Sequence, residues 1–202
     1  MHYLGLDIGG TKMEAALLSA QGDYLWRKRQ PTHKESYAEF MLHLVSLIDD
    51  ARAVSPETFT VGIGLPGAID PQTGLIKNCN CLVLNGHDLK ADLAARIHQQ
   101  VWIANDADCF TLSEAVDGAG AKADTVFGVI IGTGCGGGVA VRQHLLQGPN
   151  AIAGEWGHNP LPGYVPAIDG PAQPCYCGKH NCIESFISGT GFARRFPENL
   201  TS

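Results

Sequence analysis

The chain has 202 residues and a formal net charge of −6 at pH 7, from 14 basic and 20 acidic side chains. Hydrophobic residues make up 45% and charged residues 17% of the sequence, the ordinary balance of a soluble globular protein. Because it holds no cluster of Lys and Arg, no basic leader and no apolar run long enough to span a bilayer, we expect a cytoplasmic protein without a nucleic-acid or membrane partner.

The apolar pattern predicts an α/β chain whose order of elements starts again near residue 122. Apolar side chains at Tyr37, Phe40, Met41 and Leu44 follow helical spacing, and Asp88 stands where a later helix would take its N-cap. The expected elements are strands at 3–8, 12–18 and 23–29, a helix from 37 to 48, a strand at 60–65, a helix around 89–97, a strand at 101–104, a helix at 107–119, a strand at 125–131, a glycine-rich turn at 132–138 and a strand at 139–141. This order predicts a mixed sheet with helices against it, as a βββαβαβα lobe at 1–121 and a second lobe at 122–202.

Two glycine-rich turns resemble one another and have the chemistry to surround a phosphate group. Residues 7–12 read Asp-Ile-Gly-Gly-Thr-Lys, and residues 131–136 read Ile-Gly-Thr-Gly-Cys-Gly. Glycine lets backbone N–H groups approach an anion, and threonine adds a hydroxyl donor. Two such hairpins facing one another would hold a nucleoside triphosphate, whereas the simpler interpretation is that glycine makes tight turns. Lys12 follows Thr11 instead of preceding it, which excludes a Walker A loop, and the G-x-G-x-x-G matches open no helix.

Carboxylates stand at two of the expected strand ends. Asp7 lies directly before the first glycine turn, where a carboxylate can hold Mg²⁺ through water. Asn105 and Asp106 precede an expected helix, whose positive N-terminus favours the ionised form of Asp106. Such a carboxylate can accept a proton from a substrate hydroxyl in phosphoryl transfer. Taken alone, Asn-Asp before a helix is better explained as an N-cap.

Four soft metal ligands gather in the last third of the chain, and they are His158, Cys175, Cys177 and Cys182. One imidazole and three thiolates complete a closed tetrahedral zinc shell. Glu155 lies three residues before the histidine and Glu184 two residues after the last cysteine, so a metal here would also orient two carboxylates. The alternative is a loop of reduced, packed thiols. The other four cysteines form no disulfide framework.

Taken together in chain order, these motifs resemble the ROK family of bacterial sugar kinases. The motifs that carry the resemblance are residues 7–12, Gly-Leu-Pro-Gly at 64–67, Asn105-Asp106, Gly-Thr-Gly at 132–134, Glu-Trp-Gly-His at 155–158 and Cys-x-Cys-x₄-Cys-x-Glu at 175–184. The resemblance runs from residue 3 to about 196, and the histidine-and-cysteine segment is its most specific part. It implies an actin/hexokinase-like (ribonuclease H-like) fold, in which two lobes close over ATP and a sugar.

The resemblance also implies roles for particular residues. Asp106 would be the catalytic base. The sugar would be contacted by Gly67, Asn105, Asp106, Glu155, His158 and Glu184. The ATP phosphates and Mg²⁺ would be surrounded by Asp7, Gly9, Gly10, Thr11, Lys12, Gly132, Thr133 and Gly134. His158 would serve twice, with one ring nitrogen on structural zinc and the other free to meet a sugar hydroxyl.

The sugar is predicted from the runs around the cysteines and around Lys77-Asn78-Cys79-Asn80, which look most like the fructokinase (mannokinase-type) branch. Fructose is therefore the expected acceptor, and the similar N-acetylglucosamine kinase branch is the alternative. Asn80 is a further candidate sugar contact, although a loop asparagine is more often a turn residue. Lys12 either contacts phosphate or lies on a solvated edge.

Kinases of this family continue well past residue 202, so the resemblance predicts a truncated second lobe with uncovered apolar surface, reduced stability, weak nucleotide binding and self-association. A homodimer is common in the family. A sugar-binding relative that no longer closes over ATP is the main alternative to an enzyme. Some family members are sugar-sensing repressors with a helix-turn-helix ahead of the kinase-like part, but this acidic chain starts at the first strand, which disfavours that function.

Overall fold

The computed structural model describes residues 1–55 and 57–197, and the chain forms two compact units. Unit 1 comprises residues 1–109 and 149–151, and unit 2 comprises residues 110–148 and 152–202. The boundary between the two units falls inside the helix α3 (Asp106–Val116). The expected division of the lobes at residue 122 therefore stays a prediction, and each unit is described by itself.

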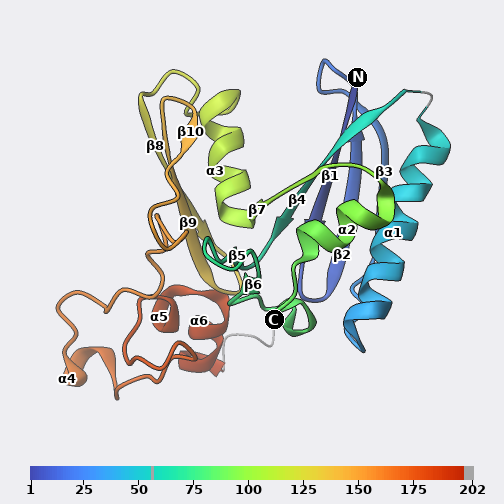
Figure 1. The fold of residues 1–202 in the computed structure, drawn as a ribbon. Coiled ribbons are helices and arrows are strands. Elements are labelled where there is room, and N and C mark those ends of the chain that lie inside the picture. Colours follow the sequence, from blue (N-terminus) through green and yellow to red (C-terminus); the bar gives the residue numbers. More distant parts are fainter. Residues whose placement is uncertain (56, 198–202) are drawn as a thin grey trace. The chain divides into compact units, whose positions relative to one another are not determined.

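Unit 1 is built on a five-stranded sheet in the order β3-β2-β1-β4-β7 (Figure 1). Its strands are β1 (His2–Ile8), β2 (Lys12–Leu18), β3 (Tyr24–Pro31), β4 (Phe59–Leu65) and β7 (Val101–Asn105). The first three form an antiparallel meander, while β4 and β7 run parallel to β1. The expected strands of this region are all present, within one or two residues at their ends. A small second sheet joins β5 (Ala68–Ile69) to β6 (Ile76–Lys77).

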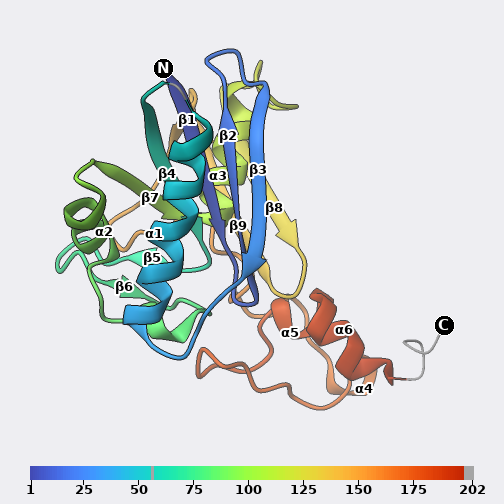
Figure 2. The ribbon, with the colours of Figure 1, turned by 90° about the vertical axis from the view of Figure 1, so that its right-hand side faces the viewer.

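Two helices, α1 (Tyr37–Val54) and α2 (Leu89–Ile97), pack against one face of this sheet, and the turn η1 (Leu82–Leu84) adds to the same core (Figure 2). The sheet contributes alternate apolar residues, so that Leu4, Leu6 and Ile8 of β1 are buried together with the apolar stripe of α1. Asp88 caps α2 as predicted, accepting from the backbone N–H of Ala91 at 2.9 Å. Ser36 caps α1 in the same manner, which the sequence analysis did not anticipate.

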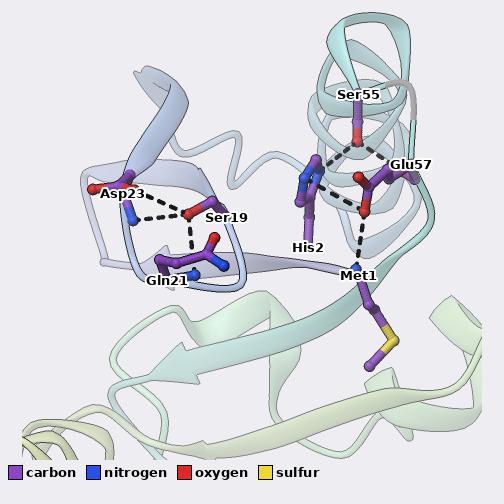
Figure 3. Close-up of polar contacts among 7 residues, drawn as sticks. All are labelled: Met1, His2, Ser19, Gln21, Asp23, Ser55 and Glu57. Atoms are coloured by element: carbon purple, nitrogen blue, oxygen red, sulfur yellow. Dashed lines mark hydrogen bonds and ion pairs between the residues drawn. The ribbon is translucent and has the colours of Figure 1, made fainter.

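Short polar contacts fasten the amino-terminal end of the sheet in unit 1 (Figure 3). The amino group of Met1 pairs with the Glu57 carboxylate at 2.9 Å, and His2 Nδ1 lies 3.1 Å from Ser55 Oγ. In the β2–β3 turn, the Ser19 hydroxyl oxygen accepts from two backbone N–H groups. The contacts of Met1 and His2 join the start of β1 to the segment that leads into β4.

Unit 2 is built on a three-stranded antiparallel sheet in the order β10-β9-β8, from β8 (Thr125–Ile131), β9 (Cys135–Val141) and β10 (His144–Leu145). The later part of α3 packs on this sheet, since a Cβ added at Gly128 would meet the Thr111 side chain. Three short helices follow, namely α4 (Pro166–Asp169), α5 (Glu184–Ile187) and α6 (Gly189–Arg195).

One expectation for the glycine-rich part of the chain was wrong. The second strand of the hairpin begins at Cys135, not at Val139, because the glycines after the turn pair with β8. Glycine is required there by close packing: a Cβ at Gly137 would lie 2.8 Å from the Trp156 side chain. The helix expected at 107–119 begins at Asp106 and ends at Val116. Within the described residues, no helix has both the length and the apolar composition needed to cross a bilayer.

Candidate active site and metal centre

In unit 1, the expected catalytic residues lie at the carboxyl ends of neighbouring parallel strands. Asp7 of β1 pairs with Gly64 of β4, and Leu65 of β4 pairs with Asn105 of β7. Ligand sites of open parallel sheets form at this end of the strands. The register therefore brings Asp7, Asn105 and Asp106 to one edge of the sheet, as the sequence predicts.

Asn105 connects this edge to the sugar-binding loop expected from the sequence. Its Nδ2 donates to the carbonyl oxygen of Gly67 at 3.1 Å, and its Oδ1 accepts from the N–H of Ala107 at 2.8 Å. The amide thus caps the start of α3 and holds residue 67 at the same time. Both interpretations of this asparagine, as an N-cap and as a site residue, are compatible with this geometry.

Asp106 is the first residue of α3, and its Oδ1 accepts from the N–H of Ala107 at 2.9 Å. Burial raises the pKa of this carboxyl, and the negative charge of Asp7 adds to the rise, while the hydrogen bond from Ala107 opposes it. The helix N-terminus favours the ionised form of Asp106, and desolvation acts against it. A carboxylate with a raised pKa is a stronger proton acceptor.

Asp108 and Cys109 extend this group and were not singled out in the sequence. Burial raises the pKa of Asp108 to about 6, with a further contribution from the charge of Asp106. Burial likewise raises the pKa of the Cys109 thiol to about 11. Cys109 Sγ would lie 3.4 Å from a Cβ at Gly64, so the glycine of β4 leaves room for the first turn of α3.

Gly67 and Asn80 come together through a tight loop. A Cβ at Gly67 would lie 2.8 Å from Cβ of Cys79, and the N–H of Asn80 donates to the carbonyl of Pro66 at 3.1 Å. Asn85 shapes this loop by bonding both the N–H and the carbonyl of Cys79, at 2.9 and 3.0 Å. The role of Asn85 was missed because its partner Cys79 lies six residues away, and no sequence motif links the two positions.

The first glycine turn is a tight hairpin between β1 and β2. The N–H of Gly9 donates to the carbonyl of Lys12 at 2.9 Å, and a Cβ at Gly9 would meet that same oxygen. Thr32 fastens the turn from β3, donating from its hydroxyl to the carbonyl of Gly9 at 2.7 Å. Gly10 and Thr11 lie at the bend, and Lys12 is exposed.

In unit 2, the second glycine turn at 132–134 is held by two segments from further along the chain. Glu184 is buried, and its Oε2 accepts from the N–H of Cys135 at 2.8 Å. A Cβ at Gly134 would lie 2.7 Å from that carboxylate oxygen, so glycine is needed for the close approach. Glu184 therefore connects the cysteine loop to the glycine turn.

The start of α6 holds the same turn through its carbonyl groups. The N–H of Gly189 donates to the carbonyl of Gly132 at 2.7 Å, and the Thr190 hydroxyl donates to the carbonyl of Thr133 at 2.8 Å. The Ser188 side chain caps α6 by accepting from the N–H of Gly191 at 3.0 Å. These contacts were missed because a Ser-Gly-Thr-Gly run by itself indicates only a helix start.

The four expected metal ligands lie together, with one ligand atom from each within 4.8 Å of all the others. His158 Nδ1 is 3.4 Å from Cys175 Sγ, and Cys177 Sγ is 3.6 Å from Cys182 Sγ. A tetrahedral zinc ion with Zn–S of about 2.3 Å and Zn–N of about 2.0 Å separates such ligands by roughly 3.5–3.8 Å. The donor set and its spacing therefore fit structural zinc. All seven cysteines of the chain are free of disulfides.

The loop that carries the cysteines is preformed by its own backbone. The N–H of Gly178 donates to the carbonyl of Cys175 at 3.0 Å, and the N–H of Cys175 donates to the carbonyl of Lys179 at 2.9 Å. Gly178 has φ of 86°, a left-handed conformation that favours glycine. These bonds turn the chain so that Cys175 and Cys177 face the same point.

The second nitrogen of His158 is not free in this structure, which corrects the expectation from the sequence. His158 Nε2 lies 3.0 Å from the Tyr176 hydroxyl, and the two rings meet edge to face. Tyr176 is 77% exposed. Desolvation and the nearby charges of Glu184 and Cys175 raise its pKa further above the ordinary value. Tyr176 was missed because it stands between the two ligands Cys175 and Cys177, and nothing in the sequence indicates which residue it contacts.

A pocket of about 280 Å³ opens beside this cluster, with Tyr176, Glu184, Thr190 and Arg194 among its lining residues. The volume is just below the roughly 300–1,000 Å³ of typical small-molecule pockets, and the lining is polar and charged. Glu155 belongs to the adjoining segment, which is fixed by Trp156 Nε1 donating to the carbonyl of Gly136 at 2.7 Å. A larger hollow of about 640 Å³ in unit 1 is lined by residues such as Arg52 and His98 and by none of the expected site residues.

Comparison with known proteins relates these two groups of residues to one family. The ROK family model matches residues 3–201. The N-acetyl-D-glucosamine kinase of Pectobacterium atrosepticum is 39% identical over 193 residues, which cover 94% of this chain and 64% of that protein. The chain therefore spans less than two thirds of the length of this relative.

Solved structures agree on the fold. The ROK hexokinase from Thermus thermophilus gives a TM-score of 0.77 at 27% identity, covering 96% of this chain and 63% of that one. A ROK family glucokinase from Streptomyces griseus, solved in complex with glucose and AMPPNP, gives 0.79 at 27% identity, covering 98% and 63%. The α/β fold is accordingly that of the ROK hexokinases, and because the family model matches almost the whole sequence, the chain belongs to the ROK family.

Proposed function

We propose that this chain carries the catalytic and sugar-binding residues of an ATP-dependent hexose kinase. The observation that supports this best is the position of Asp106, at the carboxyl end of β7 and the start of α3, with a raised pKa and with Asn105 beside it. Membership of the ROK family, whose relatives include named sugar kinases, gives the reaction class.

In the proposed reaction, a sugar hydroxyl oxygen attacks the γ-phosphorus of ATP. The bond between that phosphorus and the bridging oxygen of ADP breaks, and the hydroxyl proton passes to Asp106 Oδ. Asn105 would hold the sugar against Gly67 and Asn80. The raised pKa of Asp106 brings its proton affinity closer to what a general base needs near neutral pH.

The two glycine turns are proposed to surround the ATP phosphates, with Asp7, Gly9, Gly10, Thr11 and Lys12 from one and Gly132, Thr133 and Gly134 from the other. Mg²⁺ near Asp7 would neutralise charge on the phosphates. The close packing of Gly134 against Glu184 and the Thr32 bond to Gly9 hold both turns in shape. A preformed backbone loop can meet the anion without first being ordered.

Structural zinc is proposed at His158, Cys175, Cys177 and Cys182, because the donor set and its spacing fit that ion. Zinc would hold the loop that presents Glu184 and Glu155. These two residues, with His158 Nε2, are the proposed partners of the sugar hydroxyls in unit 2.

N-acetylglucosamine is the first candidate acceptor, because the kinase of Pectobacterium atrosepticum is named for that sugar. Fructose, the acceptor expected from the motifs, is the second candidate. A sugar-binding protein without kinase activity is the alternative class, and it is favoured by the chain spanning 64% of that relative's length.

The test is sugar-dependent ADP formation by the purified, zinc-loaded chain with Mg-ATP, across N-acetylglucosamine, fructose, mannose and glucose. Binding of each sugar is measured in parallel by calorimetry. Turnover with N-acetylglucosamine above the other sugars supports the first candidate, and turnover with fructose alone would replace it with the second. Sugar binding without turnover supports the binding protein. The absence of both binding and turnover with every sugar would refute the proposal.

A further inference from the structure

A pocket of about 280 Å³ in unit 2 lies between the cysteine loop and the two short helices α5 and α6 (Figure 1). The loop contributes Pro174 and Tyr176 to its lining, α5 contributes Glu184, and α6 contributes Thr190 and Arg194. Thr190 and Arg194 are four residues apart and therefore lie on the same face of α6. We name this space the Arg194 pocket, and all five residues belong to unit 2.

The Arg194 pocket adjoins the residues that are proposed to bind the sugar hydroxyls. Glu184 belongs to both groups, and the Tyr176 hydroxyl lies 3.0 Å from His158 Nε2. A sugar hydroxyl that displaces Tyr176 from this nitrogen brings its own ring carbon to the edge of the pocket. A substituent on the neighbouring ring carbon would then enter the pocket.

The pocket holds one positive and one negative side chain that do not pair with each other. Among the described residues, the exposed guanidinium of Arg194 has no hydrogen bond or ion pair, whereas the adjacent Arg195 donates to the carbonyl of Asp169 at 3.1 Å. Glu184 is buried, and its Oε2 accepts from the N–H of Cys135. The N–H groups of Arg194 are therefore available to a ligand that also meets the Glu184 carboxylate.

These two charges select a neutral group that accepts and donates at separate atoms. A guanidinium only donates hydrogen bonds, and an ionised carboxylate only accepts them. An amide matches this pair, because its carbonyl oxygen can accept from Arg194 while its N–H donates to Glu184. A hydroxyl has both functions on one atom, so it does not span two groups that line the pocket without contacting each other. An anionic substituent is disfavoured because it would lie beside the buried charge of Glu184.

We propose that the Arg194 pocket binds the acylamino substituent of an amino sugar, which makes Arg194 a specificity-determining residue. The acyl oxygen accepts from Arg194, the N–H donates to Glu184, and the methyl group of an acetyl lies against Pro174. The inference rests on the proposed function, because it requires Glu184 and His158 to bind the sugar hydroxyls. It deepens that function by naming the substrate class and the residue that recognises it.

The test compares N-acetylglucosamine with glucose, which carries a hydroxyl in place of the acylamino group. Calorimetric titration measures the affinity of the full, zinc-loaded chain for each sugar. The ratio of the two affinities reports on the acylamino group alone. The wild type should bind N-acetylglucosamine at least about tenfold more tightly than glucose, because hydrogen bonds to charged groups are stronger than those between neutral groups.

Arg194→Met keeps the apolar stem of the side chain and removes every N–H donor. It should lower the affinity for N-acetylglucosamine at least about tenfold and change the affinity for glucose by less than about twofold. Arg195→Met is the matched control, since Arg195 bonds to Asp169 outside the pocket, and it should keep the wild-type ratio. Arg194→Lys retains a charged donor and should recover part of the lost preference. Thermal unfolding confirms that each variant is folded.

Two results would overturn the inference while leaving the proposed function intact. One is equal affinity of the wild type for the two sugars, and the other is an equal loss of affinity for both sugars in Arg194→Met. If the folded wild type bound no sugar at all, the proposed function would fail and the inference with it. A preference for N-acetylglucosamine that disappears in Arg194→Met and persists in Arg195→Met supports both.

Discussion

At the scale of single residues, opposing influences act on the carboxylates at the start of α3. The helix N-terminus and the N–H of Ala107 favour the charged form of Asp106, while burial and the charge of Asp7 favour the neutral form. Burial prevails, and it affects Asp108 in the same direction. A chain that was selected for stability alone would have little reason to place Asp7 so near Asp106, which supports a functional role for this pair.

The first prediction concerns Asp108→Asn. The pKa of Asp108 in the folded chain, about 6, lies above the ordinary value of 3.8, so its contribution to stability is fully present below pH 4 and is lost as pH rises through 6. Asparagine does not ionise, so the variant does not lose stability at this position as the pH rises. We expect it to be more stable than the wild type at pH 7.5 by about 1–2 kcal/mol, after allowing for partial exposure.

The measurement is urea unfolding of both proteins at pH 4.0, 6.0 and 7.5. The difference in unfolding free energy between variant and wild type should grow with pH. A difference that is constant across this range would show that Asp108 ionises as it does in the unfolded chain.

The second prediction concerns Tyr176→Phe. The hydroxyl of Tyr176 lies within hydrogen-bond distance of His158 Nε2, so a sugar hydroxyl that binds this nitrogen must displace it. Removing one competing hydrogen bond should tighten sugar binding by about two- to tenfold, since such a bond is worth about 0.5–1.5 kcal/mol net. Zinc content should be unchanged because Nδ1 is the nitrogen that faces the cysteines.

Calorimetric titration with the sugar that binds the wild type checks this result. The matched control is Tyr164→Phe, whose hydroxyl donates to the carbonyl of Gly170 instead. Unchanged or weaker binding by Tyr176→Phe would show that Tyr176 does not compete for Nε2.

At the scale of elements, Glu184 joins the cysteine loop, α5 and the glycine turn of unit 2. Its N–H donates to the carbonyl of Gly157 at 2.9 Å, while its side chain accepts from Cys135. A structural metal that fixes Cys182 therefore also fixes the turn at 132–134. Two substitutions test this connection, one in the glycine turn and one in the cysteine loop.

The third prediction is that Gly134→Ala destabilises unit 2. The added Cβ would lie 2.7 Å from Glu184 Oε2, so the bond to Cys135 must lengthen or break, at a cost of about 1–3 kcal/mol. Gly132→Ala is the matched control, because a Cβ there meets nothing within 4 Å. Thermal unfolding compares the two variants, and equal loss in both would contradict the role given to Glu184.

The fourth prediction is that the metal centre depends on its thiols. The wild type should purify with about one equivalent of zinc, and Cys177→Ser should lose most of it, whereas Cys109→Ser, which lies outside the cluster, should retain it. Chelation should lower the melting temperature of the wild type by several degrees, because metal binding contributes to folding free energy. Metal analysis well below one equivalent in the wild type would refute structural zinc.

At the scale of the whole molecule, the sequence was sufficient wherever local chemistry decides. The order of β1–β4 and β7–β9 with α1–α3, the Asp88 cap and the gathering of His158 with the three cysteines follow from spacing and residue type, whereas the short elements β5, β6, β10 and α4–α6 were not predicted. The sequence failed where contacts between distant segments decide. Glycines 136–138 form a strand because they pair with β8, and His158 Nε2 is occupied because the Tyr176 hydroxyl lies 3.0 Å from it.

The register of β1, β4 and β7 brings Asp7, Asn105 and Asp106 to one edge in unit 1, and the cysteine loop brings Glu184 and His158 together in unit 2. The ROK family model matches residues 3–201 and therefore includes both groups. We therefore propose that Asp106 accepts the proton of the sugar hydroxyl.

The decisive experiment compares Asp106→Asn with Asp108→Asn, using one sugar that the wild type phosphorylates. It measures the rate of ADP formation and the affinity for that sugar. Loss of the proton acceptor should lower kcat by about 10²–10⁴-fold in Asp106→Asn, with sugar affinity retained, while Asp108→Asn should keep a rate near that of the wild type. If Asp106→Asn turned over as fast as Asp108→Asn, Asp106 would not be the base and the account of this site would be wrong.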